Sequence, residues 1–473
     1  QSSGVPENPR KTFVSGGHMS RTWPAATTSV RHKGPLKLGV LALLVTLSVA
    51  IGLRTSEPAR GQVANRPNVL VIVTDDQREG LEVMPETRQW FAQGGTYYPN
   101  AIATTPMCCP ARAAILSGRY AHNNGVTRNS NAKSLDQSKT MEAYLQKAGY
   151  TTGIFGKFFN SIGLSIDPRF FDTWATFPNS QNHYIDGYWN VQGTVKLISQ
   201  YSTDYIGTRA VEFIRSNAGR PWFLYLATPA AHTPMTAQAN YAQASVPQWD
   251  GNPAVFESDR SDKPPWVQAK SQSFSSGRSQ RTKQYRTLMS VDDMVSRIAA
   301  ALSDTGQGQD TLAFFISDNG YMWSEHKLPG KGWPYMQSIG VSMLSRWPGH
   351  ISAGERDGRL VANIDIAPTV LDAAGVVPDV HMDGRSLLGD FVRDRILAEY
   401  WAGQPKGPPP WAARLTRTDE YVEYYDPSTG SVTFREYYDL VADPWQLSNL
   451  RTPPAGAQAE LDTDRRCAGA GCP

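Results

Sequence analysis

Two pairs of oxygen-bearing side chains have the types and spacing of a metal site. Asp75 and Asp76 follow a β-branched apolar run, and Asp318 and Asn319 follow a second apolar run. Either pair alone is also typical of a loop cap or a turn. Two adjacent carboxylates buried at a strand end repel each other unless a cation neutralises them, and carboxylate and amide oxygens suit a hard cation. The two pairs together therefore predict a calcium site, with magnesium as the alternative.

A second chemical feature is the pair of adjacent cysteines, Cys108 and Cys109. They are followed by Pro110, by Arg112 and by the run Leu116-Ser-Gly-Arg119. Neighbouring cysteines pair with each other only in a strained ring, so they need another explanation. A buried cysteine at the start of a helix is one explanation. The other is a modified residue, because Cys-x-Pro-x-Arg followed by Leu-Ser-Gly-Arg resembles the signature of the type I, formylglycine-dependent sulfatases.

This resemblance implies a chemical role for Cys108. In that family a formylglycine-generating enzyme oxidises the first cysteine of the motif to Cα-formylglycine, which then joins the metal ligands. The hydrated aldehyde carries two hydroxyls on one carbon. One attacks sulfur to form a covalent sulfo-enzyme, and deprotonation of the other expels sulfate by C–O cleavage, an exit that serine lacks. The family commonly has Ser at the position of Ala111, which is a mild departure.

Three further segments fall in register with the family. Gly149-Tyr-Thr-Thr-Gly-Ile-Phe-Gly-Lys157 is similar to its GYxTxxxGK segment, Ala231-His-Thr-Pro234 is similar to its histidine segment, and Lys331 falls at its second lysine. The resemblance implies that Lys157 and Lys331 contact sulfate and that His232 donates a proton to the leaving alcohol. It also implies that Arg112 binds the formylglycine hydrate and the metal-bound anion. Taken singly, these residues are typical of solvated lysines and packed histidines.

One departure narrows the resemblance to a branch. Many sulfatases have a histidine two residues after the first lysine, whereas this chain has Phe159 there, followed by Asn160. Gly-Lys-aromatic-x-Asn looks like the branch that contains N-acetylglucosamine-6-sulfatases. The implied substrate is a sulfated carbohydrate, with the 6-O-sulfate of N-acetylglucosamine in a glycosaminoglycan-like glycan as the first choice. The candidate substrate-binding residues are His122, Asn160 and His326, and the alternative for His122 is a turn residue.

The elements that must position these residues alternate between strands and helices. This order predicts an α/β protein with a mostly parallel sheet between helices, and ligands bind at the carboxyl ends of such strands. The resemblance implies the alkaline-phosphatase-like fold. Beyond residue 388 two arms flank the turn Asp426-Pro-Ser-Thr-Gly430, which predicts a hairpin in a small C-terminal antiparallel-sheet subdomain. We expect a leader over 1–66, a catalytic domain over 67–388 and this subdomain over 389–473. The predicted strands cover 68–74, 222–227, 311–316 and 339–344, the predicted helices 140–148, 203–216 and 285–302, and the predicted hairpin arms 412–425 and 431–440.

The first 66 residues have the pattern of an export signal. An uncharged run of sixteen residues, Leu38 to Leu53, follows Arg31, Lys33 and Lys37. A membrane span needs about twenty apolar residues, so we expect a cleaved signal peptide, with a membrane anchor through 38–53 as the alternative. Near the other end, Cys467 and Cys472 could form a local disulfide in an oxidising compartment. We therefore expect a secreted or extracytoplasmic protein that meets a membrane only if the leader is uncleaved.

The charge distribution excludes one class of partner. The 473-residue chain has a formal charge of +3, but residues 1–66 hold nine Lys or Arg against two Glu, which leaves 37 basic and 41 acidic residues in the rest. A body with a net charge of −4 has no electrostatic footprint for nucleic acid.

Two other functions fit the same residues. One is hydrolysis of phosphomonoesters or phosphonate esters, because phosphate and sulfate share a tetrahedral geometry. The other is non-catalytic glycan binding, in which Cys108 remains a thiol.

Overall fold

A fully buried central strand organises the largest sheet of the structure. The computed structural model describes residues 66–178, 184–401 and 407–473, which lie in one compact unit. Strand β1 (Asn68–Thr74) pairs in parallel with β8 (Trp222–Ala227) on one side and with β9 (Thr311–Ser317) on the other. All three strands are continuous apolar runs because both faces of the sheet are covered. The predicted strands at these positions are confirmed.

The sheet that contains β1 has ten strands, and its middle is parallel. The five strands β9, β1, β8, β4 and β5 run parallel, whereas β12, β6 and β7 pair antiparallel at the flanks. This arrangement confirms the predicted α/β class. The order across the sheet is β13 (Glu355–Arg356), β2 (Thr96–Tyr98), β12 (Met343–Arg346), β9, β1, β8, β4 (Thr151–Lys157), β5 (Thr173–Phe177), β6 (Gly187–Val191) and β7 (Thr194–Ile198).

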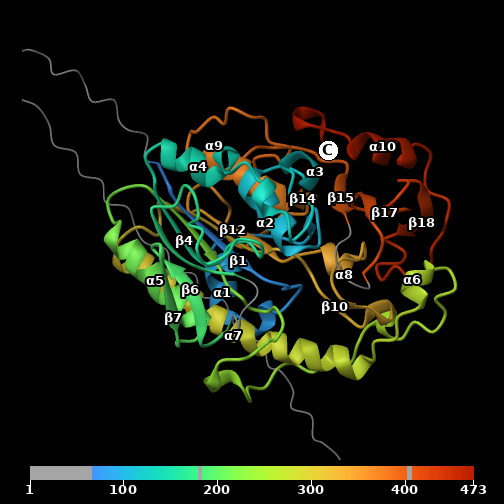
Figure 1. Ribbon diagram of the computed structural model, residues 1–473, viewed down its shortest axis with the longest axis horizontal. Coiled ribbons are helices and arrows are strands. Elements are labelled where there is room, and N and C mark those ends of the chain that lie inside the picture. Colours follow the sequence, from blue (N-terminus) through green and yellow to red (C-terminus); the bar gives the residue numbers. More distant parts are fainter. Residues whose placement is uncertain (1–65, 179–183, 402–406) are drawn as a thin grey trace, which may run out of the picture. The chain divides into compact units, whose positions relative to one another are not determined.

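Helices cover both faces of this sheet (Figure 1). Side chains alternate along a strand, so Val69, Val71 and Val73 join one core cluster and Leu70 and Ile72 join the other. Burying each of these side chains contributes about 1.5–3 kcal/mol. The first face carries α2 (Cys108–Ser117), α4 (Met141–Lys147) and α9 (Ile366–Ala373), and the second carries α5 (Ser202–Ser216) and α7 (Phe274–Asp304).

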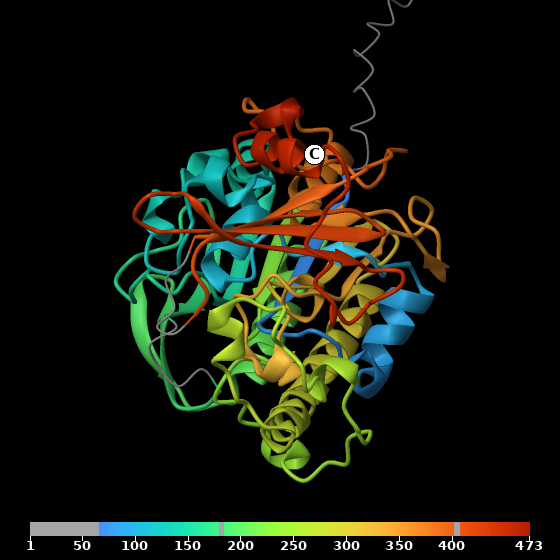
Figure 2. The same ribbon diagram turned by 90° about the vertical axis from the view of Figure 1, so that its right-hand side faces the viewer.

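The C-terminal part forms a separate antiparallel sheet. Its strands follow the order β15 (Ile396–Tyr400), β16 (Trp411–Leu415), β17 (Asp419–Tyr425) and β18 (Val432–Asp439), with α10 (Ala457–Asp464) beside them (Figure 2). Its core also takes in Met107 and Ala114 from the α2 region. The domain boundary at 388/389 stays a prediction. The remaining elements are α1 (Pro85–Thr87), α3 (Ala121–Asn124), α6 (Pro265–Gln268), α8 (Met336–Ile339), and the strand pairs β10 (Met322–Trp323) with β11 (Pro329–Gly330) and β3 (Ala101–Ile102) with β14 (Val361–Ala362).

Three predicted elements have different bounds in the structure. The single strand over 339–344 is wrong, because Ile339 ends α8 and β12 begins at Met343. The helix predicted from residue 285 begins at Phe274, where the Ser273 hydroxyl accepts the Ser276 N–H and caps a polar first half. The arm over 412–425 is two strands, since a turn between Thr416 and Asp419 reverses the chain.

The leader over 1–66, including the apolar run 38–53, lies outside the described residues except for Arg66. Within the described residues, none of the helices combines the length and apolar character that a bilayer span requires.

Candidate active site

The two acidic pairs meet at the carboxyl ends of β1 and β9. Asp75 and Asp76 leave β1, and Asp318 leaves the neighbouring β9, so the parallel pairing brings the pairs together. Ligand atoms of Asp75, Asp76, Asp318 and Cys108 all lie within 4.8 Å of one another, and all four residues are buried. The Asp76 backbone is left-handed (φ 63°), a conformation that costs a non-glycine residue about 1–3 kcal/mol and is typical of functional sites.

The donor set of this cluster fits a hard cation. Three carboxylates converge, and the Oδ1 amide oxygen of Asn319 is buried with no hydrogen-bond partner among the described residues. The Asn319 Nδ2 group donates to Asp76 Oδ1 (2.7 Å), which aligns the amide beside the carboxylates. An orphaned buried oxygen next to three carboxylates is the oxygen-rich environment that calcium or magnesium prefers. The geometry therefore supports a metal site at the predicted residues.

Cys108 is the first residue of α2 and faces this cluster. Its side chain is 1% exposed, its Sγ lies 3.4 Å from Asp75 Oδ1, and Lys331 Nζ donates to the sulfur at 2.8 Å. Burial and the Asp75 carboxylate raise the pKa of the Cys108 thiol. Cys109 points elsewhere, because its Sγ accepts the Asn160 N–H (3.1 Å). The structure thus places Cys108, and not Cys109, against the acidic cluster.

Three buried cations neutralise the carboxylates. Arg112 donates to Asp318 Oδ2 (2.9 Å), to Asp75 Oδ2 (3.3 Å) and to the Lys157 carbonyl (2.8 Å), so it ties β1, β4 and β9 together. Lys157, at the end of β4, donates to Asp75, and Lys331 donates to Asp76. Burial alone would raise the pKa of Asp75, but Lys157 and the neighbouring positive charges hold it well below its usual range. Burial and the Asp75 charge raise the pKa of Asp318.

His232 lies on the exposed side of the cluster, on the loop after β8. Its Nδ1 faces the Thr233 carbonyl (2.7 Å), and its Nε2 lies 3.9 Å from Asp76 Oδ2. The side chain is 20% exposed, in contrast to the buried carboxylates. Backbone hydrogen bonds between Asp75 and residues Ala230 and Ala231 hold this loop against the end of β1. His232 therefore lies between the buried carboxylates and solvent.

The three predicted substrate-binding residues have different surroundings. Asn160 follows Lys157 by three residues and contacts Cys109, and its Oδ1 is buried without a hydrogen-bond partner among the described residues. His326 is fully buried, bonded through Nδ1 to Glu257 (2.7 Å) and stacked on Tyr335, while its Nε2 has no hydrogen-bond partner among the described residues.

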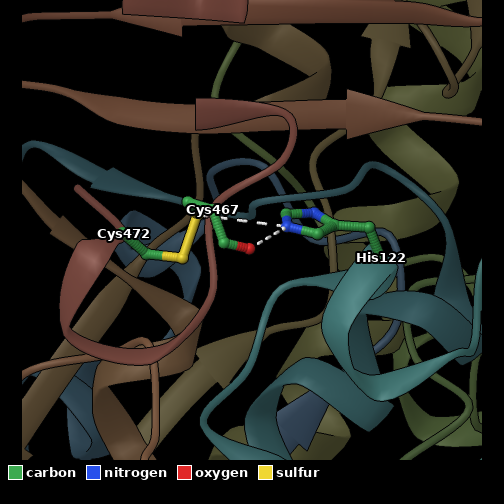
Figure 3. A group of neighbouring side chains, drawn as sticks. All are labelled: His122, Cys467 and Cys472. Carbon is green, nitrogen blue, oxygen red and sulfur yellow. Dashed lines mark hydrogen bonds between the residues drawn. A yellow bond between two sulfur atoms is a disulfide. The ribbon is translucent and has the colours of Figure 1, made fainter. Parts of the chain in front are cut away.

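His122 is bound on both ring nitrogens. Nδ1 lies 3.0 Å from Glu399, and Nε2 lies 3.0 Å from the Cys467 carbonyl (Figure 3). Burial would lower the pKa of His122, but the Glu399 carboxylate outweighs it and raises the pKa. The Cys467–Cys472 disulfide is formed, so neither sulfur of this group is a thiolate ligand.

Two supporting residues carry no signal in the sequence. Asn129 Oδ1 accepts the Cys109 N–H (2.9 Å) at the start of α2, and Gln284 of α7 donates to the Asp76 and Ala231 carbonyls (3.2 and 3.3 Å). Both act across long sequence separations, and neither stands in a motif. Tertiary folding alone brings them to the site.

Several curated relatives of this chain are named as sulfatases. Human N-acetylglucosamine-6-sulfatase is 33% identical over 356 residues, which cover 68% of this chain and 64% of the relative. The extracellular sulfatase SULF-1 homolog of Drosophila melanogaster is 32% identical over 373 residues, which cover 74% of this chain and 33% of the relative. The chain thus spans less than two thirds of the length of either relative.

Solved structures show the same fold. A protein solved in complex with its substrate D-glucosamine-2-N,6-O-disulfate matches with a TM-score of 0.74 at 21% identity, over 84% of this chain and 96% of that chain. The phosphonate monoester hydrolase of Agrobacterium radiobacter matches with a TM-score of 0.63 at 22% identity, over 84% of this chain and 94% of that chain. These matches establish the alkaline-phosphatase-like α/β fold with its C-terminal antiparallel sheet.

Family models cover most of the described residues. The model described as N-sulphoglucosamine sulphohydrolase, C-terminal, matches residues 324–466. The model described as Sulfatase matches residues 67–376, more than half of the sequence and nearly all of the site, so the chain belongs to the sulfatase family.

Proposed function

We propose that this protein hydrolyses sulfate monoesters on a carbohydrate. The observation that carries the proposal is the contact of Cys108 with Lys331 and Asp75 inside a cluster whose oxygens suit a hard cation. The 6-O-sulfate of N-acetylglucosamine is the first candidate substrate, supported by the relatives of that name and by the Asn160 segment. A cluster that suits a metal, next to a modifiable cysteine at the start of a helix, is suited to nucleophilic attack on an anionic ester.

Each residue of the cluster has a role in this reaction. Cys108, converted to formylglycine by a formylglycine-generating enzyme, provides the attacking hydroxyl. Lys157 and Lys331 bind sulfate oxygens and offset their negative charge, and His232 gives its proton to the leaving sugar oxygen. Arg112 orients Asp75 and Asp318 through its three hydrogen bonds. Calcium, with magnesium as the alternative, would be held by Asp75, Asp76, Asp318, Asn319 and the converted Cys108, and it would stabilise charge on the sulfate group.

We also propose an extracytoplasmic location. The Cys467–Cys472 disulfide is a feature of oxidising compartments, and a SULF-1 homolog among the relatives is described as extracellular. The same compartments hold sulfated glycans in reach of a secreted enzyme.

The proposal is tested on protein made with a formylglycine-generating enzyme. We expect the mass of the peptide that contains Cys108 to be that of the aldehyde, and we expect measurable kcat/KM on N-acetylglucosamine-6-sulfate and on an aryl sulfate. Cys108→Ala should abolish turnover with an unchanged unfolding temperature, while Cys109→Ala serves as the matched control and keeps the aldehyde. Full activity of Cys108→Ala would refute the mechanism, and an unoxidised thiol without turnover would favour a glycan-binding protein.

A second candidate is hydrolysis of phosphate or phosphonate esters. The likeness in fold to a phosphonate monoester hydrolase supports it, as does the shared tetrahedral geometry of the two anions. Comparing kcat/KM on an aryl sulfate, an aryl phosphate and a phenyl phosphonate separates the candidates. A large preference for either phosphorus ester would overturn the assignment to sulfate.

A further inference from the structure

A pocket of about 200 Å³ lies at the C-terminal sheet, outside the cluster described above. Its walls include Tyr400, Trp401, Trp411 and Tyr425, of which Trp401 is 39% exposed and the other three are at most 5% exposed. The rings of Tyr400 and Trp411 are stacked with centroids 6.0 Å apart. Aromatic faces of this kind pack against the C–H faces of sugar rings, since they are large, rigid and amphipathic. The exposed Trp401 therefore offers an aromatic face on which a sugar ring could pack.

Two residues that line the pocket are connected to the active site through neighbouring residues of the chain. Trp411 Nε1 donates to the Gly332 carbonyl (2.9 Å), and the residue before Gly332 is Lys331, which contacts Cys108. Arg128 precedes Asn129, which accepts the N–H of Cys109. A sugar in the pocket would thus be a near neighbour of the sugar whose sulfate reaches Cys108.

Two arginines and two acidic residues line the pocket. Arg128 and Arg465 line it, and neither forms an ion pair within residues 66–178, 184–401 and 407–473. The two acidic groups of the lining are already engaged. Glu399 binds His122, and Asp426 accepts the N–H groups of its own turn at Ser428 and Thr429. Arg128 donates to the Trp401 carbonyl (3.4 Å) and Arg465 lies over the Tyr425 ring (3.8 Å). Neither contact is with a carboxylate, so both guanidinium groups can bind a sulfate or carboxylate, which they match in geometry.

We propose that this pocket binds a second anionic group of the substrate glycan, carried by the sugar next to the one that loses its sulfate. This inference rests on the proposed function and narrows it: the preferred substrate is an oligosaccharide with two anionic sugars, not an isolated monosulfated sugar. A sulfate and a carboxylate share the required chemistry, and substrates that differ in this group distinguish them.

His122 acquires a positioning role in this arrangement. Its backbone N–H and its Nδ1 both contact Glu399, each at 3.0 Å, and its Nε2 faces the carbonyl of the disulfide-bonded Cys467 (Figure 3). Glu399 and Tyr400 are consecutive residues of β15 and both line the pocket. The C-terminal disulfide loop thus fixes the ring of His122, and His122 in turn fixes Glu399 in the wall of the pocket.

The experiment compares three substrates: an aryl sulfate, a disaccharide sulfated only at O6 of N-acetylglucosamine, and the same disaccharide with a sulfate or a carboxylate on the neighbouring sugar. Wild-type protein should have the highest kcat/KM on the doubly anionic disaccharide. Arg128→Gln and Arg465→Gln should each lower that kcat/KM about tenfold, mainly through KM, because a charge-assisted contact is lost. Both variants should have the wild-type kcat/KM on the aryl sulfate.

The controls separate this inference from the proposed function. Arg417→Gln, at an exposed turn of the same sheet, should leave kcat/KM unchanged on every substrate. The unfolding temperature of each variant shows whether it has folded. An equal loss on all three substrates, or no loss on the doubly anionic one, would overturn the pocket assignment while the sulfatase activity stands. If wild-type protein hydrolyses no sulfate ester, the proposed function fails. Calorimetric binding of the doubly anionic disaccharide to wild-type and Arg128→Gln protein then tests the pocket, and equal affinities would overturn it.

Discussion

Glu142 shows at the residue scale how burial creates a pH-dependent stability. This glutamate in α4 is 0% exposed, and among the described residues no cation lies within ion-pair distance of it. Burial raises its pKa to about 8, against the weaker opposing effect of the Thr140 hydroxyl. In the unfolded chain the same carboxyl has a pKa of about 4.3. Its pKa is thus raised on folding, so the protonated form is favoured in the native protein.

The sign of the resulting prediction follows from this rise. Between about pH 4.5 and pH 8 the folded protein holds a proton that the unfolded chain releases, so the free energy of unfolding falls as the pH rises through this window, by up to about 1.4 kcal/mol per unit. Glu142→Gln should remove this contribution and stabilise the protein at pH 7–8. Urea unfolding of the wild-type and Glu142→Gln proteins at several pH values measures how the free energy of unfolding depends on pH. Glu212→Gln, with a 54% exposed side chain, is the control and should keep the wild-type slope.

Single residues also differ in how far the sequence predicts their role. Asp75, Asp318 and Cys108 could be predicted because short motifs fix them to the ends of strands or the start of a helix. His326 could not be assigned, because a lone histidine carries no sign of whether Glu257 will bury it. The partner of His122 lies 277 residues away, at Glu399, and nothing near either residue indicates that contact.

At the scale of elements, the segment from Ser324 to Lys331 determines where the second lysine lies. Ser324, His326 and Lys327 are left-handed, with φ of 82°, 50° and 58°, which costs about 1–3 kcal/mol at each residue. The buried Glu325 holds this backbone by accepting hydrogen bonds from Arg78 (2.6 Å), Asn252 (2.8 Å) and the Trp323 N–H (2.6 Å). An ion pair in the core therefore maintains an unfavourable backbone between Ser324 and Lys327, four residues before Lys331.

Removing the charge of Glu325 should release this segment. We expect Glu325→Gln to lower the free energy of unfolding by about 3 kcal/mol, because Arg78 is left as a buried cation without its main partner. The kcat/KM on an aryl sulfate should fall as well, since Lys331 loses its fixed position. Arg78 also pairs with Glu79, whose side chain is 49% exposed, so Glu79→Gln is a matched control with an expected cost below about 1 kcal/mol. Equal effects of the two substitutions on denaturant unfolding would show that burial of Glu325 is unimportant.

Elements differ in how well the sequence predicts them. Strands β1 and β8 have the predicted bounds, because an uninterrupted apolar run has one stable placement in a covered sheet. The first half of α7 escaped prediction, since its polar side chains lack the helical spacing of apolar residues and its start depends on the Ser273 cap. The run 339–344 divides between α8 and β12 because tertiary pairing overrides local propensity.

At the scale of the whole molecule, the active site is a junction of distant segments. Its side chains come from positions 75 to 331, and the parallel sheet aligns Asp75, Lys157 and Asp318 because β1, β4 and β9 end at the same edge. That rule made the cluster predictable. The pocket with Arg128 and Arg465 was not, because it combines a loop, the C-terminal sheet and the last helix, whose contacts no local pattern encodes.

Such a junction couples metal binding to the stability of the entire fold. A cation held by Asp75, Asp76, Asp318 and Asn319 would bridge the ends of β1 and β9, and an ion that binds only the folded state stabilises it by about 2.7 kcal/mol at a concentration one hundred times its Kd. We expect the unfolding temperature of chelator-treated protein to rise on addition of calcium. Asp318→Asn should reduce this rise strongly, because it removes one carboxylate and loosens the contact with Arg112. The exposed Asp304→Asn should keep the full rise. The rise in unfolding temperature with magnesium at the same concentration, compared with the rise with calcium, shows which cation the site prefers. An unfolding temperature that neither ion changes would contradict the metal site regardless of catalytic activity, since the measurement requires neither the aldehyde nor a substrate.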